Sequence, residues 1–183
     1  MKQIKIARTG YILISILFYI SGIICMITPE LNPKTAVFVG GMILIAYGII
    51  KMTGYLSKDL YCLAFQYDFA CGLFLIVLGI GVLVFGSRFH GHLLSGLGLL
   101  ILLDSLLCIQ TSIDAKKFGL SSWPVILTLS ILAGTSGVAL AITSMQITAG
   151  CSLLAEGFMR HYIVHCTVYL SPKERRSIEE DEE

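Results

Sequence analysis

The sequence has few charged residues and few prolines. Charged residues make up 14% of the 183 positions, against about 25% in a typical soluble domain. The four prolines, Pro29, Pro33, Pro124 and Pro172, lie between or beside the long apolar runs of the chain. The low charge excludes an ordinary soluble domain. The intact apolar runs argue against the broken helices that form the binding sites of many secondary transporters.

Catalytic and nucleotide-binding motifs are also missing. The sequence contains no nucleophile elbow, phosphate-binding loop, metalloprotease motif or dinucleotide fingerprint. Its six cysteines form no Cys-x-x-Cys pair and are expected to behave as small apolar residues. We therefore expect no enzymatic activity, no cofactor, no metal site and no nucleic-acid partner.

Apolar residues dominate what is present. They make up 56% of the chain, and the mean hydropathy is +0.84. A helix needs about 20 apolar residues to cross a bilayer, and lipid cannot satisfy the polar groups of an irregular backbone. The sequence predicts an all-α integral membrane protein with the lipid bilayer as its partner. Its six transmembrane helices are expected at residues 10–28, 35–56, 65–86, 93–111, 123–143 and 147–168.

Basic residues predict the orientation, because they concentrate on the cytoplasmic side of membrane proteins. If the amino terminus is cytoplasmic, 11 of the 13 Lys and Arg residues lie at cytoplasmic ends. Only Lys34 and Arg88 then lie outside. We expect both termini to be cytoplasmic.

A short pattern occurs three times, at residues 41–51, 98–108 and 150–160. Each copy begins with Gly41, Gly98 or Gly150. The seventh position holds Tyr47, Asp104 or Glu156, and the eleventh holds Lys51, Cys108 or Arg160. A weaker repeat aligns Gly22, Gly81 and Gly137 in the other three runs.

The repeats predict three helical hairpins with a period of about 55 residues. Their ranges are about 10–58, 65–112 and 123–168, within a membrane domain of residues 1–170. Residues 171–183 form a charged cytoplasmic tail, in which Ser171 and Glu174 have the spacing of a capping box.

Small residues in the fifth run favour close helix packing. Ala133, Gly137 and Ala141 recur every four residues. This face has two interpretations, packing within the chain and a homo-oligomer interface.

Charged residues inside the apolar runs are the candidate site. An unpaired charge at the bilayer centre costs roughly 2.5–3.5 kcal/mol on insertion scales, so these side chains are expected to face the bundle interior. We predict one buried polar cluster in which two acids and two bases balance. Its members are Tyr47, Lys51, Asp104, Glu156 and Arg160.

Three roles are open for this cluster. It is a clasp that fixes how the hairpins dock, a site where Asp104 or Glu156 exchanges a proton, or part of an ion path. By contrast, Asp68 is expected to reach water at the inner end of its helix. His161 and His165, four residues apart, are interpreted as interface residues because no third metal ligand is near.

The repeat pattern and six-helix layout resemble the HdeD-like family of small bacterial membrane proteins, over about residues 10–168. The resemblance implies a multi-pass protein of the bacterial inner membrane with a role in acid or stress tolerance, and no catalytic residues. The alternative is a small transporter or channel that uses the buried acids. Its partners would be lipid, a second copy of the chain or another membrane protein.

Overall fold

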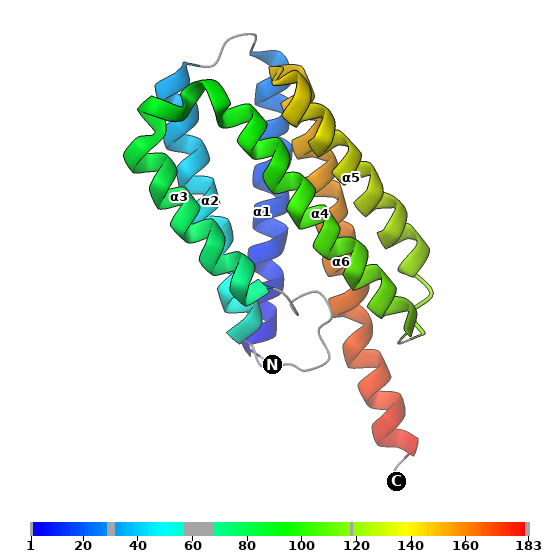
Figure 1. Ribbon diagram of the computed structural model, residues 1–183. Coiled ribbons are helices and arrows are strands. Elements are labelled where there is room, and N and C mark those ends of the chain that lie inside the picture. Colours follow the sequence, from blue (N-terminus) through cyan, green and yellow to red (C-terminus); the bar gives the residue numbers. More distant parts are fainter. Residues whose placement is uncertain (1, 29–31, 57–67, 118, 182–183) are drawn as a thin grey trace.

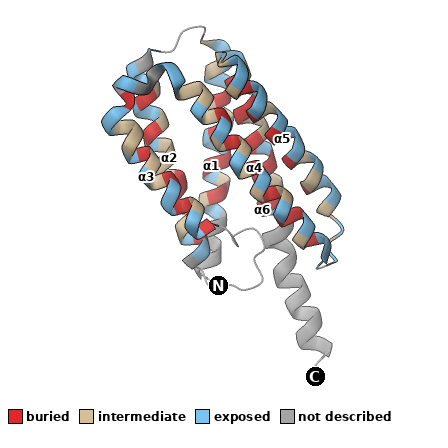
Figure 2. Cartoon of the chain, viewed as in Figure 1, coloured by how far each residue is buried: buried red, intermediate tan, exposed pale blue. Residues whose placement is uncertain are grey.

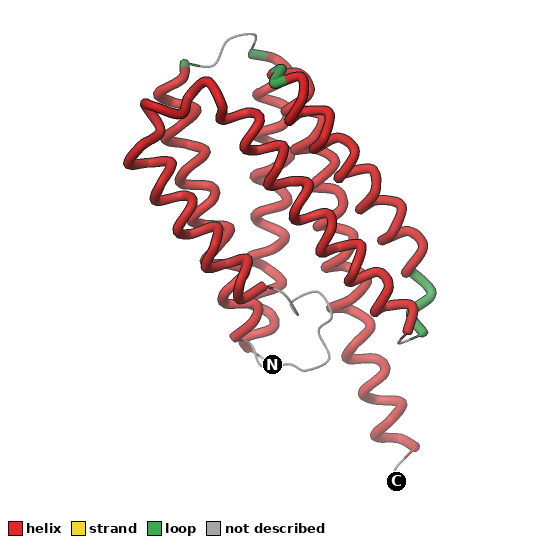
Figure 3. The backbone as a smooth tube through the Cα atoms, in the orientation of Figure 1, coloured by secondary structure: helices red, strands yellow, loops and turns green. Residues whose placement is uncertain are grey.

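The computed structural model describes residues 2–28, 32–56, 68–117 and 119–181, and they form a helical bundle (Figures 1 and 3). The predicted all-α fold with six helices is confirmed for these residues. A 3₁₀ turn, η2 (His90–His92), joins the third helix to the fourth. The six helices are α1 (Lys2–Ile27), α2 (Pro33–Leu56), α3 (Asp68–Phe89), α4 (Leu93–Lys117), α5 (Trp123–Thr143) and α6 (Gln146–Asp181).

The helix ends follow from local sequence chemistry. Pro33 and Pro124 occupy the first turns of α2 and α5, where a missing backbone N–H costs nothing. Ser144 ends α5 in the left-handed conformation, with φ of 50°. Its hydroxyl lies 2.6 Å from that of Ser95. This contact ties the α5–α6 turn to the first turn of α4.

Five of the helices, α1 to α5, are long and apolar enough to cross a membrane. The sixth, α6, carries Glu156, Arg160 and His161 in the middle of its apolar stretch and is not among them. Both ends of the chain lie toward the same end of the bundle (Figure 1). Buried positions form stripes along the helices, and large apolar side chains are exposed between them (Figure 2). Such an apolar exterior suits lipid rather than water.

The most extensive helix contacts join α2 to α3, α4 to α5, and α6 to α1. The helices α2 and α4 thus each pack most closely on the odd-numbered helix that follows, and α6 packs most closely on α1. The most closely packed helix pairs therefore differ from the predicted hairpins. Each pair joins the second helix of one hairpin to the first helix of another. Glycines explain this choice of helix pairs, because helices associate in lipid where small residues let their backbones approach closely.

The first glycine of every repeat copy contacts another glycine across one of these three pairs. A Cβ added to Gly98 would lie 2.6 Å from the carbonyl oxygen of Gly137, and one added to Gly137 would lie 2.8 Å from that of Gly98. Gly150 and Gly22 make the same reciprocal contact, at 2.8 and 2.9 Å. Larger residues at these positions would force the helices apart.

In the α2–α3 pair the partner glycine is Gly79, and the alignment of Gly81 with Gly22 and Gly137 is wrong. A Cβ on Gly79 would lie 2.9 Å from the carbonyl oxygen of Gly41. A Cβ on Gly81 would meet nothing within 4 Å. Sequence similarity therefore selected Gly81, which lies two residues after Gly79, the glycine that contacts α2.

The small residues of α5 pack within the chain. Ala133, Gly134 and Gly137 are buried, and a Cβ on Gly98 would lie 2.6 Å from the backbone nitrogen of Ala141. This is the first of the two interpretations of that face.

The last helix continues past the predicted end of the membrane domain. It runs without a break through Ser171 to Asp181, so the expected tail prolongs α6. Lys58, Cys62, residues 65–67 of the predicted third span and the final two glutamates lie outside the described residues.

Replacing Gly79 with Ala should lower the free energy of unfolding by about 1–3 kcal/mol, because overpacked methyl groups displace their neighbours. The added methyl would meet the backbone of Gly41 and Ile45. Gly81→Ala is the matched control on the same helix. It should be neutral or stabilising by up to about 1 kcal/mol, the helix propensity gained over glycine. Unfolding in detergent measures both, and equal effects would contradict the packing assignment.

Candidate functional site: a buried charged network

Polar and charged side chains from five helices meet inside the bundle. All five residues predicted for the buried cluster lie in it, together with Tyr11 and Asp68. We call these seven residues the charged network. They come from α1 (Tyr11), α2 (Tyr47 and Lys51), α3 (Asp68), α4 (Asp104) and α6 (Glu156 and Arg160).

Lys51 joins two carboxylates on different helices. Its Nζ lies 2.9 Å from Oδ1 of Asp68 and 3.2 Å from Oδ1 of Asp104. Only 1% of Lys51 is exposed, so water does not screen these ion pairs as it would at a protein surface. The single ammonium therefore links α2 to both α3 and α4.

Arg160 joins the other side of Asp104 to Glu156. Its Nη2 forms an ion pair with Oδ2 of Asp104, and its Nε lies 3.3 Å from Oε1 of Glu156. Glu156 and Arg160 are one turn apart on α6, the spacing at which helical side chains meet. Asp104 is thus held between two cations from two other helices.

Tyr47 fills the space between the two cations. Its hydroxyl donates a hydrogen bond of 3.0 Å to Oδ2 of Asp104. The Nζ of Lys51 lies 5.1 Å from the Tyr47 ring centroid, and the guanidinium carbon of Arg160 lies 5.8 Å from it. Phe18 packs edge-on against the same ring at 5.4 Å. An aromatic ring suits this position because its face attracts cations.

The expectation that Asp68 reaches water is wrong. Asp68 is 3% exposed, accepts a hydrogen bond from the Tyr11 hydroxyl at Oδ2, and binds Lys51 at Oδ1. Its position in the first turn of α3 suggested solvent, but Lys51 and Tyr11 reach it from two neighbouring helices. Asp68 lies outside the three repeat copies, so the repeat gave no signal for its burial.

The expected balance of two acids and two bases is also wrong, because Asp68 adds a third acid. Along the network the groups alternate in charge: Asp68, Lys51, Asp104, Arg160 and Glu156. With every group ionised, the network carries a formal charge of −1. The two residues at the ends of this series, Asp68 and Glu156, are therefore both acids.

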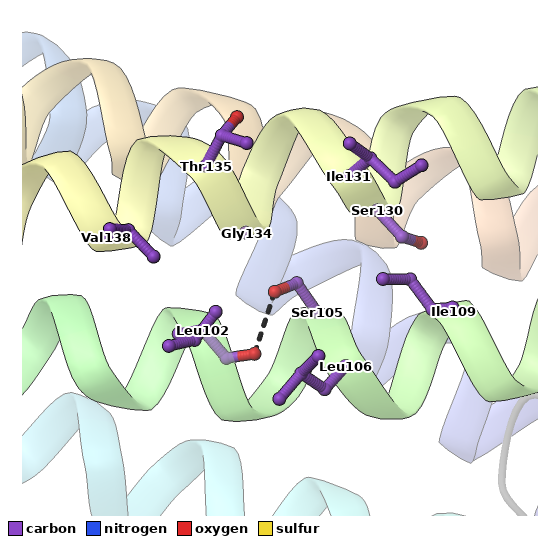
Figure 4. A pocket seen from close by; sticks show the side chains of 9 residues that line it. All are labelled: Leu102, Ser105, Leu106, Ile109, Ser130, Ile131, Gly134, Thr135 and Val138. Carbon is purple, nitrogen blue, oxygen red and sulfur yellow. Dashed lines mark hydrogen bonds between the residues drawn. The ribbon is translucent and has the colours of Figure 1, made fainter.

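A separate groove of about 300 Å³ lies between α4 and α5 (Figure 4). None of the residues that line it is charged. The hydroxyls of Ser105 and Ser130 donate to carbonyl oxygens of their own helices, those of Leu102 and Ile126, both at 2.8 Å. The groove therefore offers an apolar surface and little polar recognition.

Histidines and cysteines lie outside the charged network. His161 and His165 are exposed on α6. Cys108, which takes the eleventh repeat position, is buried beside Ile126 and Met159. Within the described part of the chain, no three His, Cys, Asp or Glu side chains are placed to hold a metal ion.

The network can fix helix positions and hold charge. Asp68 and Asp104 each have both carboxylate oxygens in contact with a donor. Glu156 differs, since its Oε2 is buried and has no hydrogen-bond partner. It is the acid with capacity to take a further group.

Comparison with known families gives one match. Residues 13–84, from within α1 to near the end of α3, match the family model described as a short repeat of unknown function (DUF308). No curated protein and no solved structure matches the chain. Over that segment, the chain is similar to a family of short repeats of unknown function. The described helices there are long and apolar enough to cross a membrane.

Replacing Lys51 with Met should destabilise the bundle by about 3–5 kcal/mol, the cost of leaving a buried charge without its partner. Asp68 and Asp104 would both lose a cation. Adding Asp68→Asn should recover part of the loss, because one uncompensated carboxylate is removed. Thermal unfolding in detergent measures the stability of the two single variants and of the double variant. If the two single losses simply add in the double variant, the two residues do not interact.

Tyr11→Phe removes the hydroxyl that serves Asp68 and should cost about 1.5–3 kcal/mol, the range for a hydrogen bond to a charged group. Tyr55→Phe is the control, because Tyr55 is half exposed and its ring contact with Phe69 does not need the hydroxyl. A Tyr11→Phe protein as stable as the control would contradict the role of this bond.

Proposed function

We propose that this chain is a non-enzymatic, multi-pass protein of the bacterial inner membrane that contributes to acid or stress tolerance, like the HdeD-like proteins it resembles. The observation that carries the proposal is the charged network, in which charged side chains from four helices form ion pairs with one another. A group of this kind changes its interactions when protons are added. It therefore couples the state of the bundle to acidity.

The burial of these acids supports a non-enzymatic role. A catalytic carboxylate must reach the atom it serves in a bound substrate. Lys51, Asp68, Glu156 and Arg160 are all less than 5% exposed. These charged groups bind one another, because each of the two cations is paired with two acids.

The proposal includes six membrane spans with both termini in the cytoplasm. In α6, Glu156 and Arg160 pair with each other and Arg160 pairs with Asp104, which lowers the cost of placing that helix in lipid. The basic residues at the ends of the spans give the orientation. Lipid surrounds the apolar exterior, and a second copy or another membrane protein is a further partner.

A transporter or channel that uses the buried acids is the second candidate. The observation in its favour is the unpartnered Oε2 of Glu156, which could receive a cation in transit. Against it, no charged side chain lines the groove between α4 and α5.

Deleting the gene should reduce survival of the host at low pH, and the wild-type chain should restore it. Purified protein in liposomes should move neither protons nor a solute under a pH gradient, because the charged groups of the network bind one another. Proton movement that is abolished by Glu156→Gln, a variant expected to fold, would establish the transporter instead. Normal survival of the deletion strain in acid would overturn the proposed role.

A further inference from the structure

We propose that the charged network binds one exchangeable proton, held on Oε2 of Glu156, so that the network is neutral when the bundle is assembled. This inference deepens the proposed function and rests on it for its biological meaning. The ligand is a proton, and the reaction is its reversible addition to a carboxylate, with no electron transfer.

The charged network is not neutral when every group is ionised. Three carboxylates and two cations leave a formal charge of −1. Four of these five residues are less than 5% exposed, and the side chain of Asp104 is 13% exposed. A buried carboxylate without full compensation is strongly disfavoured, and such a group takes up a proton instead. A single proton makes the network neutral.

Donors contact both carboxylate oxygens of two of the three acids. Asp68 has Lys51 on one oxygen and the Tyr11 hydroxyl on the other. Asp104 has Lys51 on one oxygen, and Arg160 and Tyr47 on the other. These donors stabilise the ionised form of both acids.

Glu156 has the weakest compensation of the three acids. Among the described residues, its one partner is Nε of Arg160, which donates a long hydrogen bond of 3.3 Å to Oε1, at the weak end of the N–H···O range. Its Oε2 has no hydrogen-bond partner, and the residue is 2% exposed. A protonated Oε2 carries no charge, so its burial costs far less.

Other groups do not change this balance. Among the described side chains of the charged network around Glu156, the cations are Lys51 and Arg160. The helix α5 carries no titratable residue. The uncharged or acidic ones from the remaining helices are Tyr11, Tyr19, Tyr47, Asp68, Cys71, Asp104 and Cys108.

The test compares Glu156→Gln with Asp104→Asn in the purified full-length protein. Glutamine copies a protonated glutamate and needs no proton uptake on folding, so the unfolding midpoint of Glu156→Gln at neutral pH should equal or exceed that of the wild type. Asp104→Asn removes an ionised partner of two cations and should lower the midpoint on the order of 10 °C or prevent folding. A Glu156→Gln protein destabilised as much as Asp104→Asn would show that Glu156 is ionised, and would overturn the inference.

The pH dependence gives a second readout. The folded chain holds one proton that the unfolded chain releases near neutral pH, so wild-type stability should fall as pH rises. Glu156→Gln should lack this component. Infrared difference spectra should show the protonated carboxyl band of the wild type at neutral pH and its loss in Glu156→Gln. A band that persists in the variant would contradict the assignment.

Replacing sodium by choline at constant pH and ionic strength separates a proton from a metal cation. The unfolding midpoint should not change. A sodium-dependent stabilisation absent from Glu156→Gln would overturn the proton in favour of a bound cation. Normal acid survival of a deletion strain would instead remove the proposed function and leave the proton site intact, so the two failures are distinguishable.

Discussion

Everything in this bundle depends on giving each buried charge an opposite charge. Asp104 occupies the middle position, because it is the acid of the charged network that pairs with both Lys51 and Arg160. Through these two cations it connects α4 to α2 and α6, and Lys51 extends the connection to Asp68 on α3. Removing any one partner leaves another charge unpaired in an apolar interior, where the penalty is large. The arrangement of the helices is therefore specified by electrostatics as well as by packing.

Close helix contact makes this pairing geometrically accessible. Gly98 against Gly137 and Gly150 against Gly22 bring backbones together in pairs, which leaves the even-numbered helices free to direct long side chains inward. The three pairs are connected to one another through contacts of α1 with α2 and of α5 with α6. One repeat pattern thus has two functions. Its first position sets how closely helices approach, and its seventh and eleventh positions supply most of the network that those helices enclose.

Much of the fold and most of the site could be predicted. Helix number follows from apolar runs of bilayer length, because lipid leaves the backbone no alternative. The membership of Tyr47, Lys51, Asp104, Glu156 and Arg160 follows from their shared repeat positions. Asp68 was missed because it lies at a helix end and outside the repeat. Gly79 was missed because similarity between α3 and the other odd-numbered helices favoured Gly81, which packs on nothing within 4 Å.

The helical class, the apolar exterior and the presence of buried charges that need partners can all be read from the linear sequence. These properties depend on composition and on local chain chemistry, which a linear sequence contains. Only the tertiary structure decided which helices pair, that Asp68 and Tyr11 join the charged network, and that Glu156 is the acid with an unpartnered oxygen. Those outcomes depend on distances between groups far apart in the chain, and small differences in packing register decide them.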